Sequence, residues 1–380
     1  MRVEISDLVG LRAHRAAGRD LRGALLTGLD LTDPEDDRLL RTAMDGAVLL
    51  GCVVSPGTAR RAEAAGALLF PSIPELPYEV YRTRLYTPEE LFAGFEPEYP
   101  QSYVDTVDAR VYRHTREQGR QPDPLHALAE RLHDHAITEA LGAELVGRRP
   151  VAVMGGHALR RDSGAYRAAV ELGVAIGRSH LGFTVLTGGG PGAMEAVPLG
   201  VRLSGWGESA VDGAVQVLGE VPEFGSDPEG IGRWLAAGLR VELPDADERA
   251  RTIGIPTWFY GHEPPNPFCG RHAKYFANSV REDGLLSVAT GGVIYMPGSA
   301  GTVQEVFQDY AQNHYASFGP PAPMVFLGRD FWTRQVPAAV LVQQLAQGRE
   351  AERWLLVTDE PAEAVALLEA YAVDAAEQGI

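Results

Sequence analysis

The sequence contains almost no lysine. Of its 34 basic residues, Lys274 is the only lysine. Because an ammonium and a guanidinium differ in geometry and hydration, one lysine in a chain of arginines indicates either a specific role for Lys274 or an accident of composition. Acidic residues outnumber basic ones, and the formal net charge is -17. This charge argues against sequence-independent binding to DNA or RNA, which depends on neutralising phosphates.

Cysteines and long apolar runs are also scarce. Cys52 and Cys269 lie far apart and form no metal-binding motif, so we predict neither a disulfide framework nor a metal site. No apolar run reaches the roughly eighteen residues of a membrane helix. The polar, acidic first seven residues lack the apolar core of an export signal. We therefore expect a cytoplasmic protein that makes no contact with a membrane.

The 380 residues are enough for two domains of ordinary size. Residues 1–120 alternate short apolar runs with proline-rich connections, which predicts a smaller N-terminal α/β domain of unassigned role. Residues 118–124 contain two prolines and no apolar side chain, and they indicate a boundary near residue 120. A linker and connecting helix are expected over 121–146, followed by a larger domain over 147–380.

From residue 151 onward, short apolar runs alternate with glycine turns and amphipathic segments. Strands are predicted over 151–154, 183–186, 252–259, 291–296, 324–327 and 354–357. Helices are predicted over 163–179, 231–239, 271–289, 303–315, 336–345 and 361–371. This alternation predicts an α/β fold with a doubly wound, Rossmann-like parallel sheet flanked by helices.

Three glycine-rich turns follow predicted strands of this sheet. Ligands of open parallel sheets bind beyond the carboxyl ends of the strands, so the three turns should converge on one site. The candidate binding residues in the turns are Gly155, Gly156, His157, Gly188, Gly189, Gly190, Met194, Glu195, Gly298, Ser299, Gly301 and Thr302. Asn266 and Lys274, on segments that lead to the same edge, complete the predicted binding set.

The third turn also carries an acidic residue. Pro297 ends the strand, small residues allow a ligand to approach the backbone, and Thr302 is a good N-cap for the next helix. A helix N-terminus at this place offers N–H groups to an anion. Glu305 lies three residues after Thr302, where it either closes a capping box or faces the ligand.

The sequence Pro297-Gly-Ser-Ala-Gly-Thr-Val-Gln-Glu305 resembles the PGGxGTxxE signature of the LOG (lysine-decarboxylase-like) Rossmann family. The match to the family includes the segment 188–195. The segments 155–157, 192–196 and 263–267 look most like the larger branch of nucleotide 5'-monophosphate nucleosidases, which implies a nucleotide-binding catalytic domain over 147–380. The resemblance covers roughly residues 145 to 372. It implies hydrolysis of a nucleotide to free base and ribose 5-phosphate by catalytic Glu305 and Arg281, without a cofactor, in a homodimer or higher homo-oligomer.

The sequence departs from the family pattern at two places. Ser299 stands where the family usually has glycine, and counting back from Pro297 places Glu282 where Arg281 is expected, which implies a one-residue insertion. A second catalytic carboxylate is not evident, and Glu195, Glu263 and Asp309 are candidates for positioning water.

Other functions of the same fold stay open. A non-catalytic nucleotide or cofactor carrier is one alternative, and a cytokinin-type phosphoribohydrolase is another. Amino-acid decarboxylation is disfavoured because a pyridoxal enzyme needs a Schiff-base lysine and Lys274 is the single lysine.

Overall fold

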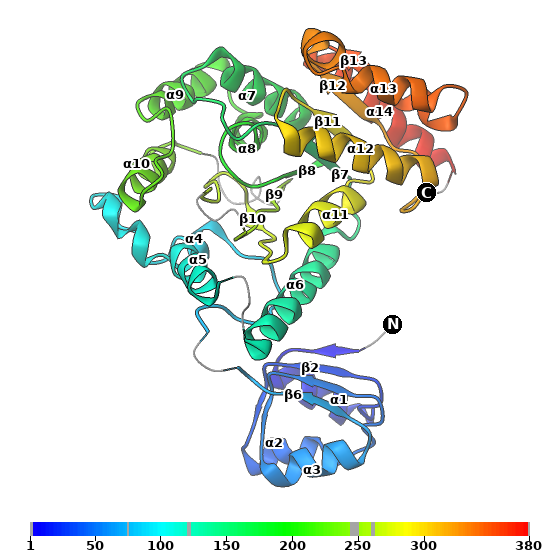
Figure 1. Cartoon of the computed structure of the whole chain (residues 1–380). Helices are drawn as coiled ribbons and strands as arrows, with labels where there is room; N and C mark the ends of the chain where they lie inside the picture. Colours follow the sequence, from blue (N-terminus) through cyan, green and yellow to red (C-terminus); the bar gives the residue numbers. More distant parts are fainter. Residues whose placement is uncertain (1–2, 74–75, 120–122, 244–250, 260–262, 379–380) are drawn as a thin grey trace. The chain divides into compact units, whose positions relative to one another are not determined.

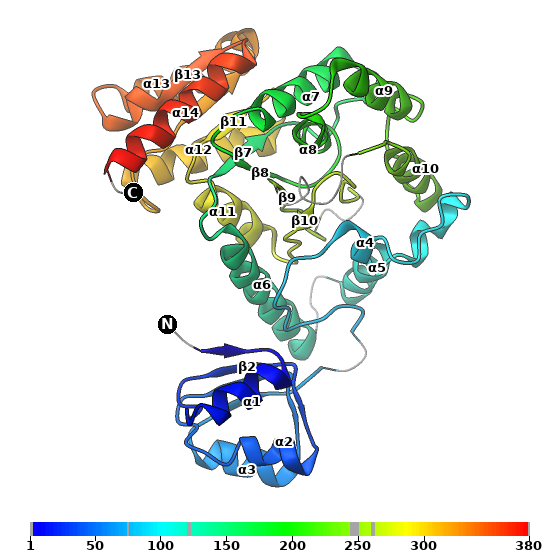
Figure 2. The same cartoon turned by 180° about the vertical axis from the view of Figure 1, so that it is seen from behind.

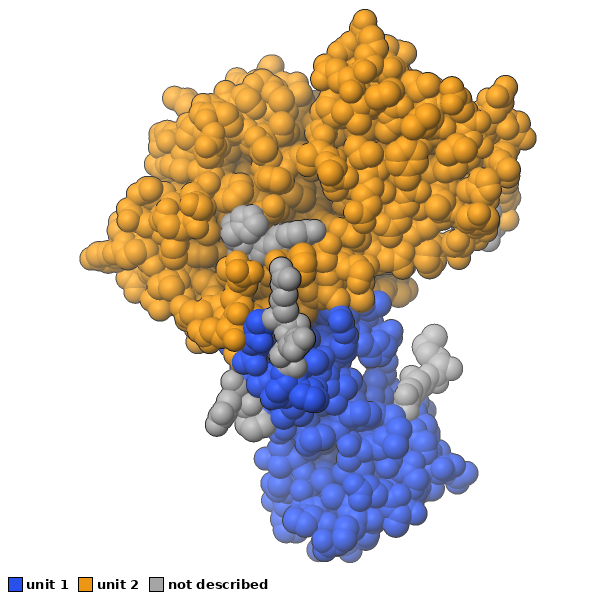
Figure 3. All heavy atoms as spheres, viewed as in Figure 1, with its two compact units in different colours: residues 1–84, 118–140 blue, residues 85–117, 141–380 orange. Residues whose placement is uncertain are grey.

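The computed structural model describes residues 3–73, 76–119, 123–243, 251–259 and 263–378, and it divides the chain into two compact units (Figure 3). Unit 1 comprises residues 1–84 and 118–140, and unit 2 comprises residues 85–117 and 141–380. The division differs from the predicted boundary near residue 120, because residues 85–117 belong to the larger unit. Residues 120–122 of the predicted linker lie outside the described residues.

Unit 1 is a small α/β unit. A four-stranded parallel sheet has the order β1 (Glu4–Ile5), β2 (Leu25–Thr27), β4 (Val48–Leu50), β6 (Leu68–Phe70), and β3 (Asp30–Leu31) pairs with β5 (Val53–Val54). The helices are α1 (Leu8–Ala16), α2 (Pro34–Leu39) and α3 (Pro56–Ala64), together with most of α6 (Pro124–Leu145). Buried leucines from the strands and α1 form its core.

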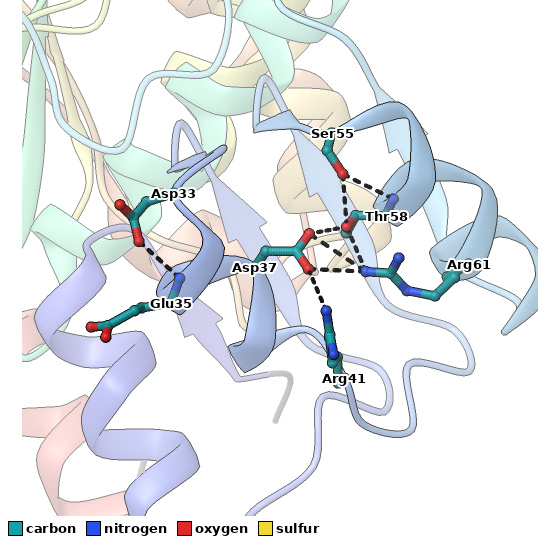
Figure 4. A network of polar contacts seen from close by, with 7 residues as sticks. All are labelled: Asp33, Glu35, Asp37, Arg41, Ser55, Thr58 and Arg61. Atoms are coloured by element: carbon teal, nitrogen blue, oxygen red, sulfur yellow. Dashed lines mark hydrogen bonds and ion pairs between the residues drawn. The ribbon is translucent and has the colours of Figure 1, made fainter.

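Helices α2 and α3 start alike and are joined by a polar network (Figure 4). Asp33 and Ser55 cap them, and each cap is followed by proline, whose fixed φ suits the first helical position. Asp37 of α2 accepts a hydrogen bond from the Thr58 hydroxyl of α3 and pairs with Arg61, whose Nη2 lies 3.1 Å from Oδ2. The Thr58 hydrogen bond, more than the Arg61 charge, lowers the pKa of Asp37.

Unit 2 is built on a seven-stranded parallel sheet with the order β10-β9-β8-β7-β11-β12-β13 (Figure 1). The strands are β7 (Pro150–Met154), β8 (Thr184–Thr187), β9 (Thr252–Gly254), β10 (Arg271–His272), β11 (Val293–Tyr295), β12 (Met324–Leu327) and β13 (Leu355–Thr358). The chain runs outward from β7 to β10 and then returns to β11 on the other side of β7. The predicted doubly wound fold is confirmed.

The helices of unit 2 largely follow the predicted segments. They are α4 (Pro88–Leu91), α5 (Val107–Gln118), α7 (Gly164–Gly177), α8 (Ala193–Leu203), α9 (Glu208–Gly219), α10 (Pro228–Leu239), α11 (Asn278–Val288), α12 (Ala300–Tyr315), α13 (Ala338–Ala346) and α14 (Pro361–Gln378), with the short helical turns η1 (Pro100–Asp105), η3 (Phe331–Gln335) and η4 (Glu350–Trp354). Helix α9 lies where no helix was predicted. The helix predicted over 271–289 is wrong in its first half, where β10 and a loop precede α11.

The sheet of unit 2 is covered on both faces (Figures 1 and 2). On one face, Val151, Val153 and Ile294 pack with apolar side chains of α7, α8 and α14. On the other face, the Tyr295 ring stacks on Phe326 and lies edge-on to Trp332 of η3. Two buried layers explain why the central strands are uniformly apolar rather than alternating.

Residues 85–117 are held in unit 2 by specific contacts. Tyr86 bridges to His272 of the edge strand β10. Phe92 and Tyr103 join a buried cluster with Trp234 and its neighbours on α10. A Cβ atom at Gly232 would lie 1.9 Å from the carbonyl oxygen of Pro100, so the backbones approach as closely as glycine allows. The described helices include none that is long and apolar enough to cross a membrane.

Candidate functional site

Three glycine turns meet at the carboxyl ends of β7, β8 and β11. The Gly156 N–H donates to the carbonyl oxygen of Pro297 (3.3 Å), and the Gly156 oxygen accepts from the Ala193 N–H at the start of α8 (3.1 Å). The turn after β7 is therefore bonded to both of the others. Since β7 and β11 are neighbours where the strand order reverses, the turns lie at the crevice in which open α/β sheets bind ligands.

The turns enclose a pocket of about 260 Å³. Its walls come from all three turns, from segments that follow β9, and from α11 and α12. The lining residues are Gly155, Gly156, His157, Gly188, Gly190, Met194, Pro256, Thr257, Glu263, Arg281, Glu282, Ser299, Gly301, Thr302 and Glu305. Most of the predicted site residues are thus brought together, whereas Gly189, Glu195, Asn266, Lys274 and Gly298 do not line the pocket.

Arg281 and Glu305 form an ion pair in the wall of the pocket. Arg281 Nη1 lies 3.5 Å from Glu305 Oε1, and the two side chains are only 12% and 13% exposed. Arg281 Nε also donates to the carbonyl oxygen of Ile255 (2.8 Å), which fixes the guanidinium. Burial raises the pKa of Glu305, and the Arg281 charge opposes that rise. The pair therefore places a shielded carboxylate, held by a cation, beside the glycine turns.

No family model matches this chain, and no curated protein does. Among the described residues, no group of three or more His, Cys, Asp and Glu side chains is placed to hold a metal ion.

The position of Glu282 bears on the register of the predicted arginine. Glu282 lines the pocket but accepts hydrogen bonds from Asn278 Nδ2 (2.6 Å) and Gln304 Nε2 (2.9 Å). Arg281, not Glu282, contacts Glu305. The geometry favours the assignment that includes the one-residue insertion.

The start of α12 differs from the predicted one. Its N-cap is Ser299, and Thr302 lies inside the first turn, so a capping box between Thr302 and Glu305 is wrong. Within the described chain, the Ser299 side chain makes no capping hydrogen bond. Gly298 does not line the pocket. A Cβ atom there would lie 2.2 Å from the Thr302 hydroxyl, so only glycine fits at this position. Because the N-cap side chain does not bond to them, the backbone N–H groups in the first turn of α12 can donate to a ligand.

Asn266 and Gly189 support the second glycine turn rather than line the pocket. Asn266 Nδ2 donates to the carbonyl oxygens of Gly190 (3.1 Å) and Met194 (3.0 Å). The Asn266 N–H donates to the Gly189 oxygen (2.8 Å). Gly189 has a φ of 74°, a conformation that favours glycine. The prediction of direct substrate contact by these two residues is replaced by a structural role.

Glu195 is buried away from the pocket. Its carboxylate pairs with Arg161, whose Nε lies 3.2 Å from Oε2, and the Arg161 guanidinium lies 4.3 Å from the ring centroid of Trp234. Both charged side chains are almost fully buried. Met194 points into the pocket, and on a helix the next residue turns about 100° away, so Glu195 faces the protein interior. Glu195 is therefore excluded as a substrate ligand.

Lys274 is buried as well, and it lies in the loop between β10 and α11. Its ammonium contacts Asp108 Oδ1 and lies 5.1 Å from the Trp258 ring centroid. Asp108 also accepts hydrogen bonds from Trp258 Nε1 (3.0 Å) and Tyr103 OH (3.0 Å). Burial lowers the pKa of Lys274, and Asp108 opposes that effect. The lysine thus joins residues 85–117 to the sheet, and the prediction that it binds substrate is corrected.

Asp309, a candidate for positioning water, lines a second cavity of about 390 Å³ near the start of β7. Tyr295 OH donates to its Oδ2 (2.7 Å), and Asn313 Nδ2 donates to Oδ1 (3.2 Å). Burial raises its pKa to about 7, against the opposing effect of the Tyr295 hydrogen bond. Asp309 does not line the pocket that holds Glu305.

The raised pKa of Asp309 predicts a pH-dependent stability. An unfolded aspartate loses its proton near pH 4, whereas folded Asp309 keeps it to about pH 7. The folded state binds more protons in this window, so stability falls as pH rises. Asparagine does not titrate, so Asp309→Asn should not share this loss. We expect the free energy of unfolding of the variant, minus that of wild type, to be larger at pH 8 than at pH 4 by on the order of 3 kcal/mol. Urea unfolding of both proteins at both pH values measures this difference. A difference in the free energy of unfolding that is the same at pH 4 and pH 8 would contradict the prediction.

Proposed function

We propose that this protein hydrolyses the N-glycosidic bond of nucleoside 5'-monophosphates, releasing free base and ribose 5-phosphate. The observation that carries the proposal is the Arg281–Glu305 pair, 3.5 Å apart, beside three converging glycine turns. The resemblance of residues 297–305 to the LOG signature supports the same chemistry.

The proposed mechanism uses the charge of Glu305. Breaking the bond between C1' and the base leaves positive charge on the sugar, and a carboxylate held close to it stabilises that transition state. The Arg281 guanidinium favours the ionised form of Glu305 and fixes its position. The pocket is shielded enough for this charge to act strongly, because the Glu305 side chain is 13% exposed.

The phosphate of the substrate would bind at the first turn of α12. Ser299, Gly301 and Thr302 line the pocket there, and a helix N-terminus attracts an anion through its N–H groups and dipole. The Ser299 hydroxyl adds a donor that a glycine lacks. Met194, on the second turn, would then contact the base.

A panel of nucleotides tests the proposal. We expect incubation with AMP, GMP, CMP, UMP and dAMP to release free base and ribose 5-phosphate, or its deoxy form, from at least one of them. Chromatography of the bases and a coupled assay for the sugar phosphate measure both products. Tight binding without either product would instead support a nucleotide carrier.

A further inference from the structure

The pocket contains a carboxylate that the Arg281–Glu305 pair does not engage. Three glutamates line it, and two have strong partners: Glu305 pairs with Arg281, and Glu282 accepts from Asn278 and Gln304. The third, Glu263, is 22% exposed at its side chain and has Oε1 3.7 Å from Nδ1 of His157. Within the described residues, the Glu263 carboxylate therefore lies beside the imidazole of His157 and not beside an arginine guanidinium.

Glu263 and Glu305 come from different sides of the crevice. Glu263 lies in the segment after β9, whereas Glu305 lies on α12, after β11. Strands β8 and β7 separate β9 from β11 in the sheet, and the pocket lies over their glycine turns. A Cβ atom at Gly190 would lie 3.7 Å from Glu263 Oε2, so this carboxylate reaches over the second turn. A substrate in the pocket would therefore have one carboxylate on each side.

Many glycosidases use two carboxylates that flank the scissile bond, and in the inverting ones a carboxylate acts as the general base that activates water. In this pocket Glu305 would stabilise the cationic sugar, and a second carboxylate would take a proton from the attacking water. Glu305 has a cation to hold it ionised, which suits the first role. Glu263 faces an imidazole rather than a guanidinium, and its side chain is more exposed than that of Glu305, so water can reach it, which suits a general base.

We propose that Glu263 is the general base that activates water, and that His157 is the residue that positions it; this rests on the proposed nucleosidase function. The water oxygen forms a bond to C1' while the bond from C1' to the base nitrogen breaks and its electron pair stays on the base. The proton taken from water by Glu263 passes to the departing base through solvent. No oxidant, reductant or further reactant is needed.

Replacement of Glu263 separates this role from a structural one. We expect Glu263→Ala to lower kcat by about a hundredfold to a thousandfold, with KM and nucleotide affinity nearly unchanged. Sodium azide should restore turnover to the variant, because a small anionic nucleophile needs no general base, and ribosyl azide 5-phosphate should form. Glu305→Ala should show no such rescue. Glu171→Gln, an exposed carboxylate on α7, is the control for expression and folding.

Each outcome distinguishes the two proposals. If the wild-type protein hydrolyses a nucleotide and Glu263→Ala does so equally fast, the role of Glu263 is overturned and the nucleosidase function stands. Loss of activity together with a lower melting temperature and no azide rescue also overturns it, since Glu263 would then be structural. Absence of base release by wild type from every nucleotide defeats the nucleosidase function itself, and the role of Glu263 with it.

Discussion

Replacing Glu305 with Gln should lower kcat for base release by about a hundredfold to a thousandfold, the loss seen when one preorganised electrostatic group is removed from an active site. Glutamine keeps the shape of the side chain but not its charge, so it cannot stabilise a cationic sugar. Glutamine keeps the size of the side chain and burial already opposes the charge of Glu305, so the fold should persist, with a modest loss of stability because the Arg281 charge is left uncompensated. Steady-state kinetics at pH 8 and denaturant unfolding measure the two effects.

The control for Glu305→Gln is Glu171→Gln on α7. The Glu171 side chain is 54% exposed and pairs with Arg167 at 2.9 Å, and it lies on α7, which contributes no residue to the pocket. We expect it to retain wild-type kcat. Turnover by Glu305→Gln within a fewfold of wild type would contradict the proposed mechanism.

Replacing Lys274 with Met should destabilise the protein by about 3 kcal/mol without a direct effect on substrate binding, because removing one partner of a buried ion pair leaves the other uncompensated. Asp108 would keep its hydrogen bonds from Trp258 and Tyr103 but lose its counter-charge in a site where it is 1% exposed. Chemical denaturation followed by circular dichroism measures the loss.

The double variant Asp108→Asn with Lys274→Met is the matched control. Asparagine still accepts a hydrogen bond but carries no charge, so the double variant should recover part of the stability lost by Lys274→Met. The opposite pattern, unchanged stability with a raised KM, would return Lys274 to the substrate-binding residues.

The fold could be predicted because its signals are local. The buried strands are apolar on both faces, and glycine turns mark their carboxyl ends, so β7, β8, β11 and β12 were expected within a residue or two. The boundary near 120 could not be predicted from local signals. The contacts that hold residues 85–117 in unit 2, such as Asp108 with Lys274 and Tyr86 with His272, join residues more than a hundred positions apart.

The position of the pocket could be predicted from the same local signals, whereas two of the residues assigned to it, Glu195 and Lys274, were wrong for a physical reason. Glycines placed after strands converged because parallel strands end at one edge of a sheet. Glu195 and Lys274 are charged residues next to real site segments, and the sequence does not show that each has a buried partner elsewhere, Arg161 and Asp108. Both turns were expected at the same edge of the sheet and Glu263 was a candidate for positioning water, but no sequence signal indicated that His157 is the residue beside Glu263.

The buried position of Lys274 has a consequence for chemical labelling. Because the sequence has no other lysine and this one is fully buried, reagents that acylate lysine amines find no ε-amine at the surface of the folded protein. Its ammonium also carries a carboxylate partner, which keeps it unreactive while the pair is intact. Modification of Lys274 therefore requires an opening that exposes it, such as separation of residues 85–117 from the sheet, and its rate reports how often such openings occur.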